Sequence, residues 1–237
     1  VQRRQAMLKA MQINISEKII DIGCGGGHLV EEIAKSVGVQ GKVIGLDPSS
    51  SQIDSAKDRC KELTNTEFLC SSANKIKLED NSIDTITSTQ TLEYIRDVDA
   101  TLIEIKRVSK NKSKFFNIST LWDFYRFHGP EQKLNDHIHN VFKDHCYHQM
   151  LPTSLNGMLN KLGYTNIKTH ELAFVFTQRN QNSFATFAEI FLANFALGKG
   201  VEKEKVTEWR RQIKKAEGNG SFCFTAIPIL TEAYLEK

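Results

Sequence analysis

Two patterns of apolar and polar positions alternate through the first half of the chain. A short, mostly apolar run predicts a buried strand at residues 18–22, and further strands are predicted at residues 42–46, 67–70, 83–88 and 114–118. Between them, the spacing of apolar residues predicts helices at residues 28–37, 50–63 and 98–109. Strands that alternate with helices in this way are typical of a parallel, doubly wound sheet. In such sheets, ligands bind at the carboxyl ends of the strands.

The second half of the chain is less regular. Residues 119–151 show no clear period, whereas residues 155–162 predict a helix, 170–177 a strand and 201–217 a charged helix. Residues 183–197 are strongly apolar, and residues 221–230 are interpreted as a last strand. Because no stretch has the composition of a linker, we expect one domain over residues 1–237.

Four phenylalanines in the apolar segment follow a helical spacing. Phe184, Phe187, Phe191 and Phe195 are separated by three, four and four positions, which places them on one face of a helix. We expect this face to pack into the core. A lid over a ligand pocket is the alternative.

Composition narrows the class of protein. Apolar residues make up 40% and charged residues 25% of the chain, an ordinary balance for a folded domain. The formal net charge of +3 argues against a dedicated nucleic-acid binder. Residues 1–11 are helix-like and basic without a continuous apolar stretch, so we expect no secretory signal peptide. The sequence contains no run of 18 apolar residues, so we expect no membrane span.

The cysteines indicate the compartment. The chain has five, an odd number, and no pair is spaced as Cys-x-x-Cys. Because this pattern does not predict a disulfide framework, we expect a reducing, cytoplasmic setting.

A glycine-rich segment follows the first predicted strand. Gly23, Gly25 and Gly27 lie between that strand and the next helix, where a tight turn or a bound ligand requires backbone freedom. A dinucleotide fingerprint would place its third glycine at His28, so the spacing here differs. Asp47 follows the second strand, where a carboxylate can accept hydrogen bonds from both hydroxyls of a ribose.

Four motifs carry a resemblance to a known family. They are D-I-G-C-G-G-G at residues 21–27, G-L-D-P-S at 45–49, S-S-A-N-K-I-K-L-E-D-N-S-I-D at 71–84 and T-L-E-Y-I-R-D at 91–97. In this order they resemble class I S-adenosylmethionine-dependent methyltransferases, most closely the small-molecule group of ubiquinone and menaquinone biosynthesis. The resemblance implies a Rossmann-like, doubly wound α/β sheet of seven strands, mostly parallel with an antiparallel last strand. It also implies a helical cover over the active site.

The resemblance further implies how the domain and its cofactor site are organised. Residues 1–118 would be the cofactor-binding half, and residues 119–237 would complete the sheet and cover the substrate. The residues implied for S-adenosylmethionine are Asp21, Gly23, Gly25, Gly27, Asp47, Ser72, Ala73, Thr89 and Gln90. Two of the matched positions depart from the family: Ser72 replaces an aspartate at the adenine edge, and Tyr94 replaces a histidine. Because a hydroxyl accepts more weakly than a carboxylate, we expect modest cofactor affinity.

The reaction itself leaves little signature in a sequence. Methyl transfer from a sulfonium is an in-line displacement, so the protein mainly aligns the reactants and excludes water. A general base is needed only for an acceptor that ionises poorly. Candidate bases or acceptor contacts are His128, Asp123 and His148. The pairs His137-x-His139 and His145-x-x-His148 can chelate, but nothing completes a metal site, so we expect no metal.

The sequence therefore favours transfer of a methyl group to O, N or C of a small molecule. One alternative is an RNA methyltransferase, although residues 88–92 read S-T-Q-T-L instead of the D/N-P-P-Y/W segment that stacks a flipped base. The other alternative is a non-catalytic regulator that binds the cofactor.

Overall fold

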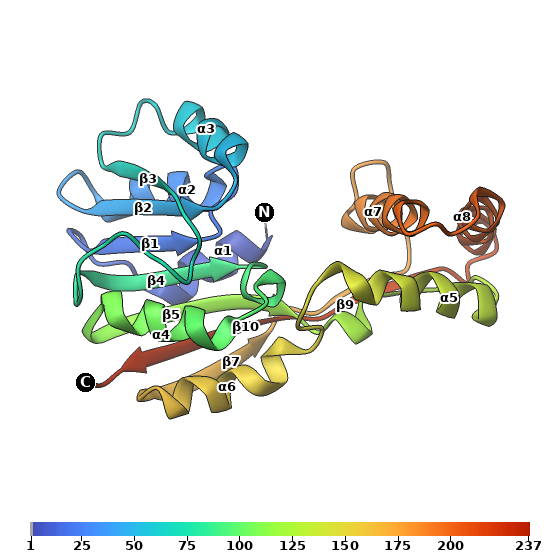
Figure 1. The fold of residues 1–237 in the computed structure, drawn as a ribbon. Coiled ribbons are helices and arrows are strands. Elements are labelled where there is room, and N and C mark those ends of the chain that lie inside the picture. Colours follow the sequence, from blue (N-terminus) through green and yellow to red (C-terminus); the bar gives the residue numbers. More distant parts are fainter. Residues whose placement is uncertain (1) are drawn as a thin grey trace. The chain divides into compact units, whose positions relative to one another are not determined.

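The structure is a computed structural model that describes residues 2–237, and Val1 of the expected N-terminal helix lies outside these residues. The chain forms two compact units (Figure 1). The sheet unit consists of the residues up to Ser119 together with Leu151–Glu171 and Ile229–Lys237. The helical unit consists of Thr120–Met150 and Leu172–Pro228. The expectation of a single domain stays a prediction.

The sheet unit contains a seven-stranded sheet in the order β3-β2-β1-β4-β5-β10-β7. Its strands are β1 (Lys18–Ile22), β2 (Lys42–Asp47), β3 (Thr66–Cys70), β4 (Ile83–Thr89), β5 (Ser109–Thr120), β7 (Tyr164–Glu171) and β10 (Pro228–Leu235). Strands β1 to β5 pair in parallel, and β10 pairs with β7 antiparallel. This sheet confirms the predicted fold class, while the helical cover over the site stays a prediction.

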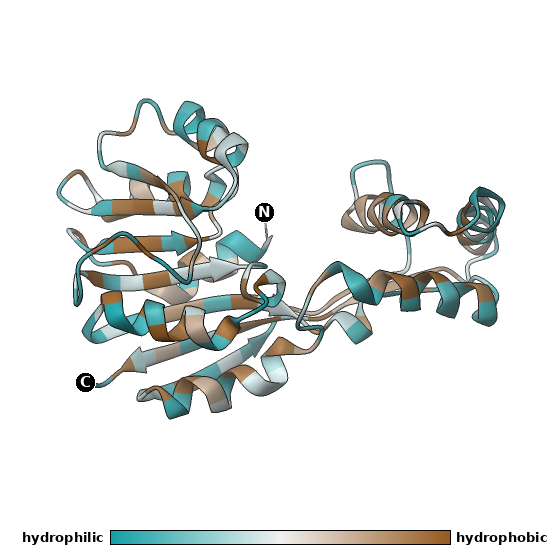
Figure 2. Ribbon diagram, viewed as in Figure 1, coloured by the Kyte–Doolittle hydropathy of each residue, from teal (hydrophilic) through white to brown (hydrophobic). Residues whose placement is uncertain are grey.

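Helices that precede or connect the strands cover the sheet. They are α1 (Gln2–Met11), α2 (His28–Val37), α3 (Ser50–Arg59), α4 (Val98–Val108) and α6 (Leu151–Lys161). Helices α4 and α6 share one apolar core with strands β1, β2, β4 and β5. Figure 2 shows β1 and β2 as mostly hydrophobic and α3 as largely hydrophilic. The four buried residues that end β1 explain why the first strand is readable as an apolar run.

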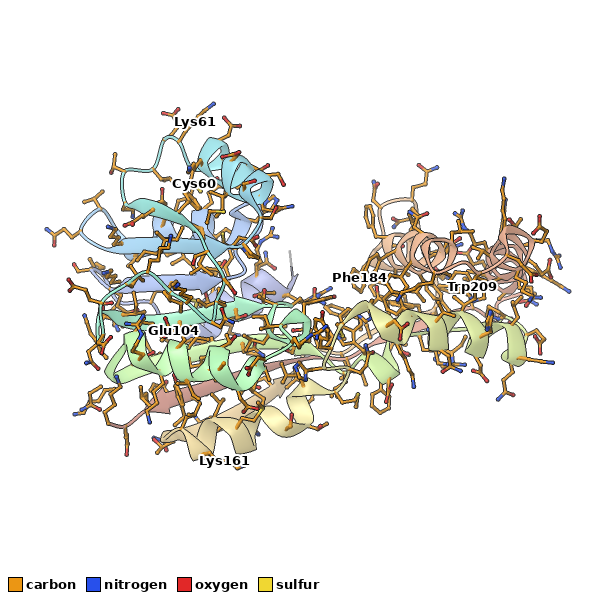
Figure 3. All side chains as sticks on the ribbon, viewed as in Figure 1. Cys60, Lys61, Glu104, Lys161, Phe184 and Trp209 are labelled. Carbon is orange, nitrogen blue, oxygen red and sulfur yellow. The ribbon has the colours of Figure 1, made fainter. Side chains whose placement is uncertain are left out.

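The helical unit is built around a second apolar core. Its elements are a three-stranded antiparallel sheet of β6 (Arg126–His128), β9 (Cys223–Ala226) and β8 (Phe174–Phe176), with helices α5 (Gln132–Phe142), α7 (Phe184–Gly198) and α8 (Lys203–Gly218). Trp209 and Phe184, labelled in Figure 3, belong to this core. The buried Trp209 Nε1 donates to Asn135 Oδ1 at 2.8 Å, and Asn135 Nδ2 donates to the carbonyl of Phe127.

Two predicted strands of the second half were wrong in their bounds. Residues 221–230 are not one last strand, because the segment divides between β9 of the small sheet and β10 of the large one. Pro228 lies at the break and has no N–H to donate to a ladder. Residues 170–177 divide in the same way between β7 and β8. Strand β7 lies at the sheet edge with mostly half-exposed or exposed residues, so it lacks the signal of a buried strand.

Helix α5 was not predicted. Its buried face includes Asn135 and His139 beside Ile138 and Phe142, so its apolar period is interrupted by polar residues. Helix α3 also ends earlier than predicted, at Arg59. Within residues 2–237, every helix is too short or too polar to cross a bilayer.

Candidate functional site

The glycine loop joins β1 to α2 and is held against the end of β2. The N–H groups of Gly23 and Cys24 donate to the carbonyl of Leu46 at 2.7 and 3.0 Å. Gly23 has φ +72°, and a Cβ added there would lie 2.1 Å from Thr91 Oγ1. Gly27 caps α2 in the left-handed conformation at φ +78°. Both positions therefore require glycine, and the loop is fixed before any ligand binds.

Asp47 ends β2 and ties the glycine loop to the start of the next helix. Its Oδ2 accepts a hydrogen bond from the Gly25 N–H at 3.0 Å, and its Oδ1 accepts from the Ser49 N–H at 2.9 Å. A carboxylate oxygen accepts more than one hydrogen bond, so each oxygen keeps capacity for a further donor. The half-buried carboxylate is thus oriented by backbone groups on both sides.

A pocket of about 310 Å³ lies in the sheet unit beside this loop. Five of the residues expected at the cofactor line it: Gly23, Asp47, Ser72, Ala73 and Gln90. These residues come from the ends of four strands, β1 to β4, and the loops that follow, as expected for a parallel sheet. The structure therefore brings together residues that are up to 67 positions apart in the sequence.

Sequence reasoning missed the other half of the pocket wall. Leu46, Pro48, Thr91, Tyr94 and Ile95 also line it. Leu46 and Pro48 flank Asp47, and the other three lie inside the T-L-E-Y-I-R-D motif, so adjacency to recognised motifs was the available signal. Tyr94 is exposed by 37% and replaces the histidine of the family at this wall.

The remaining expected cofactor residues lie near the pocket without lining it. Gly25 is bonded to Asp47, and Gly27 caps α2. Asp21 is buried in β1, where it accepts from Thr87 Oγ1 at 2.9 Å. Thr89 ends β4 next to Gln90, and its buried Oγ1 has no hydrogen-bond partner within residues 2–237. A buried hydroxyl without a partner is unusual and fits a site that a polar ligand completes.

Burial controls the ionisation of the two groups beneath the loop. Burial raises the pKa of Asp21 to about 7; the Thr87 hydrogen bond opposes this shift and the charge of Asp47 adds to it. Burial also raises the pKa of the Cys24 thiol, and the charges of Asp21 and Asp47 raise it further. Cys24 therefore stays a neutral thiol at physiological pH and is a poor nucleophile.

The candidate catalytic residues all belong to the helical unit. His128 is largely exposed, and its Nε2 lies 3.4 Å from Thr225 Oγ1. Partial burial of its ring lowers the pKa of His128, and the charge of Arg126 lowers it further. Asp123 is exposed and pairs with Lys143 at 3.3 Å. His148 is half-buried. Nothing in this arrangement singles out one of the three as a base.

The histidine pairs do not form a chelating arrangement. His137 is exposed, whereas His139 is buried, with its Nε2 accepting from the Phe127 N–H at 3.2 Å. Burial lowers the pKa of His139 to about 3 and that of His145 to about 4. His145 stacks on Phe142 with the ring centroids 4.0 Å apart. Across residues 2–237, no group of three His, Cys, Asp or Glu side chains is arranged to hold a metal ion.

The interpretation of the phenylalanine stripe as core was wrong for its centre. Phe187 and Phe191 are exposed by 58% and 45%. Helix α7 instead buries a face of small and aliphatic residues that includes Ala188 and Leu192. Phe184 and Phe195, at the two ends of the stripe, are partly buried against the core of the helical unit.

A Rossmann-like sheet whose glycine loop and second-strand carboxylate border one pocket defines the class of α/β domains that bind a nucleotide-like cofactor. Residues 13–189 match the family described as "Methyltransferase domain". The chain therefore belongs to this methyltransferase-domain family.

Individual relatives cover different shares of the chain. The chain is 32% identical over 107 residues to the demethylmenaquinone methyltransferase of Staphylococcus saprophyticus, which covers 45% of this chain and 46% of that protein. The chain spans less than half the length of the curated relatives it matches. Among solved structures, the YcgJ protein of Bacillus subtilis has a TM-score of 0.71 at 16% identity and covers 100% of this chain and 99% of that one.

A second solved structure was determined with ligands. It is phosphoethanolamine N-methyltransferase 2 of Haemonchus contortus, in complex with phosphomonomethylethanolamine and S-adenosylhomocysteine. Its TM-score is 0.64 at 16% identity, and the match covers 100% of this chain and 53% of that one. At this identity, both structures establish the fold alone.

Proposed function

We propose that the chain is an S-adenosylmethionine-dependent methyltransferase that acts on O, N or C of a small molecule. One observation carries the proposal: the glycine loop, Asp47, Ser72 and Gln90 border a single pocket in a chain of the methyltransferase-domain family. The S-adenosylhomocysteine bound by the ligand-containing structural neighbour, which is what S-adenosylmethionine becomes after methyl transfer, supports the same proposal.

The residues present fit this cofactor. Asp47 keeps acceptor capacity on both oxygens and would hold the two ribose hydroxyls. Ser72 and Ala73 would border the adenine, and the apolar Leu46 and Ile95 would contact its faces. Gly23 would admit the aminoacyl part of the cofactor close to the backbone.

Two further residues act around the reacting end of the cofactor. Asp21 lies under the loop, where a cationic amino group would favour its ionised form. Thr89 and Gln90 follow β4, where the reactive methyl group is expected, and the unpartnered Thr89 hydroxyl offers a polar contact there.

The cofactor supplies a methyl group already activated as a sulfonium substituent. The protein then has to align the acceptor with that methyl group and exclude water. A base is required only where the acceptor atom ionises poorly. For such an acceptor, His128, Asp123 and His148 of the helical unit remain the candidates, and the helical unit would also provide the cover that selects the acceptor.

The acceptor is proposed to be small. The net charge of +3 supplies too few excess cations for a large phosphate-contacting surface. The demethylmenaquinone methyltransferase relative supports a quinone as one acceptor class. A reducing, cytoplasmic setting is proposed from the cysteine pattern.

A methyl-transfer assay tests the proposal. The protein is incubated with isotope-labelled S-adenosylmethionine and, in parallel, a metabolite extract, a demethylated quinone and total RNA. We expect label in one small metabolite, as the gain of one methyl group by mass spectrometry, and much less label with Asp47→Ala at limiting cofactor. Label in RNA alone would replace the proposal with the RNA alternative. Cofactor binding without any product would favour the regulator.

A further inference from the structure

The cofactor pocket is short of positive charge. Among the described residues that line it, Asp47 is the only one with a charged side chain. S-adenosylmethionine carries a carboxylate, and a carboxylate that leaves water needs charged or strongly polar donors. If the pocket binds this cofactor, as the proposed function requires, a residue outside the lining has to supply the missing positive charge.

Arg3 is a cationic residue that forms a hydrogen bond with a residue of the pocket wall. It lies in the first turn of α1, and its Nη1 donates to Oε1 of Gln90, which lines the pocket. Gln90 adopts a left-handed backbone with φ +50°, and its N–H donates to the carbonyl of Ile118 at 2.7 Å. A non-glycine residue in this conformation is uncommon and is found where the surrounding contacts hold it.

Helix α1 is anchored, so Arg3 is presented at a defined place. Met7 and Met11 are buried with at most 1% exposure. The next arginine, Arg4, turns to α2, where its Nε pairs with Glu32 Oε1 at 2.8 Å. Two adjacent arginines thus have separate partners: one at the pocket wall and one on a neighbouring helix.

We propose that Arg3 is a cofactor-binding residue whose guanidinium is the counter-charge for the carboxylate of S-adenosylmethionine. A guanidinium has five N–H donors in a planar fork, and this geometry matches the two oxygens of a carboxylate. Gln90 acts as the positioning residue that directs the fork to the pocket. Helix α1 thereby becomes part of the cofactor site, although it precedes every recognised motif.

Calorimetry with two probes tests this assignment. Wild type, Arg3→Ala and the matched control Arg4→Ala are titrated with S-adenosylhomocysteine, which has the carboxylate, and with 5′-methylthioadenosine, which lacks it. We expect Arg3→Ala to weaken S-adenosylhomocysteine binding by about tenfold or more, the usual effect of losing a hydrogen bond to a charged group. Binding of 5′-methylthioadenosine is expected to stay unchanged, as is binding of both probes by Arg4→Ala.

Two results would overturn the inference. Equal affinity of wild type and Arg3→Ala for S-adenosylhomocysteine would remove Arg3 from the site. Equal weakening of both probes by Arg3→Ala would show damage to the pocket in general. Failure of the proposed function has a different signature, because wild type itself would then bind neither probe.

Discussion

At the scale of single residues, the site depends on two aspartates in different surroundings. Asp47 is half-buried and accepts two backbone hydrogen bonds, which orient its carboxylate. Asp21 is buried in β1 with one hydroxyl donor, and burial raises its pKa to about 7. We propose that Asp47 accepts hydrogen bonds from ribose hydroxyls and that a nearby cation favours the ionised form of Asp21.

The raised pKa of Asp21 predicts how stability depends on pH. The folded state binds the proton at pH values where the unfolded chain, with a pKa near 3.8, has released it. The contribution of Asp21 to the free energy of unfolding therefore falls as pH rises from about 4 to about 7 and is constant above that. Asp21→Asn should abolish this part of the pH dependence while keeping an acceptor for Thr87.

Urea denaturation at pH 5 and pH 8 checks this prediction. The free energy of unfolding of Asp21→Asn minus that of wild type should be larger at pH 8 than at pH 5. For the exposed-site control Asp54→Asn, this difference should be the same at both pH values. The same pH profile for Asp21→Asn and wild type would show that Asp21 does not titrate in this range.

Residue-level prediction from the sequence succeeded where the signal is local. The glycine loop and Asp47 could be located because a strand, a turn and a helix follow one another within a few residues. Tyr94 was noted only as a departure from a motif, although its place inside that motif was the available signal for the pocket wall. Arg3 could not be found, because its contact with Gln90 joins residues 87 positions apart.

At the scale of elements, helix α7 shows that an apolar composition does not reveal which face of a helix is buried. It is apolar all around, so a stripe of large phenylalanines suggested the buried face. The structure buries the smaller side chains, which allow the helix to approach its neighbours closely, and leaves Phe187 and Phe191 exposed. An exposed aromatic pair on a helix of the helical unit keeps the acceptor-lid interpretation open as a proposal.

Two substitutions on α7 test which face supports the fold. Phe187→Ala should lower the free energy of unfolding by less than about 0.5 kcal/mol, as expected at an exposed position. Leu192→Ala removes a fully buried side chain and should cost about 2–5 kcal/mol. Chemical denaturation measures both. A cost at Phe187 comparable to that at Leu192 would restore the core interpretation.

Strands of the sheet unit were most readily predicted where they are buried on both faces and read as apolar runs, as β1 and β2 do. The helical unit lacked such a signal. Helix α5 buries Asn135 and His139, and the break before Pro228 divides what reads as one strand. These features depend on partners far along the chain, such as Trp209, so no local pattern reveals them.

At the scale of the whole molecule, we propose that cofactor binding and acceptor choice belong to different units. The sheet unit carries the pocket and every residue assigned to the cofactor. The helical unit carries the candidate bases and the exposed aromatic face of α7. The proposed division places cofactor binding in the part that resembles the family most closely, and acceptor choice in the part that resembles it least.

The central claim is that the pocket beside Asp47 binds S-adenosylmethionine. Its most direct test is a calorimetric titration of wild type, Asp47→Ala and Asp58→Ala with S-adenosylhomocysteine; Asp58 is an exposed aspartate on α3 that pairs with Lys61. We predict one-site binding by wild type and Asp58→Ala, and a loss of about 1.5–3 kcal/mol in binding free energy for Asp47→Ala. No binding by wild type at saturating ligand, or the same affinity in all three proteins, would contradict the account.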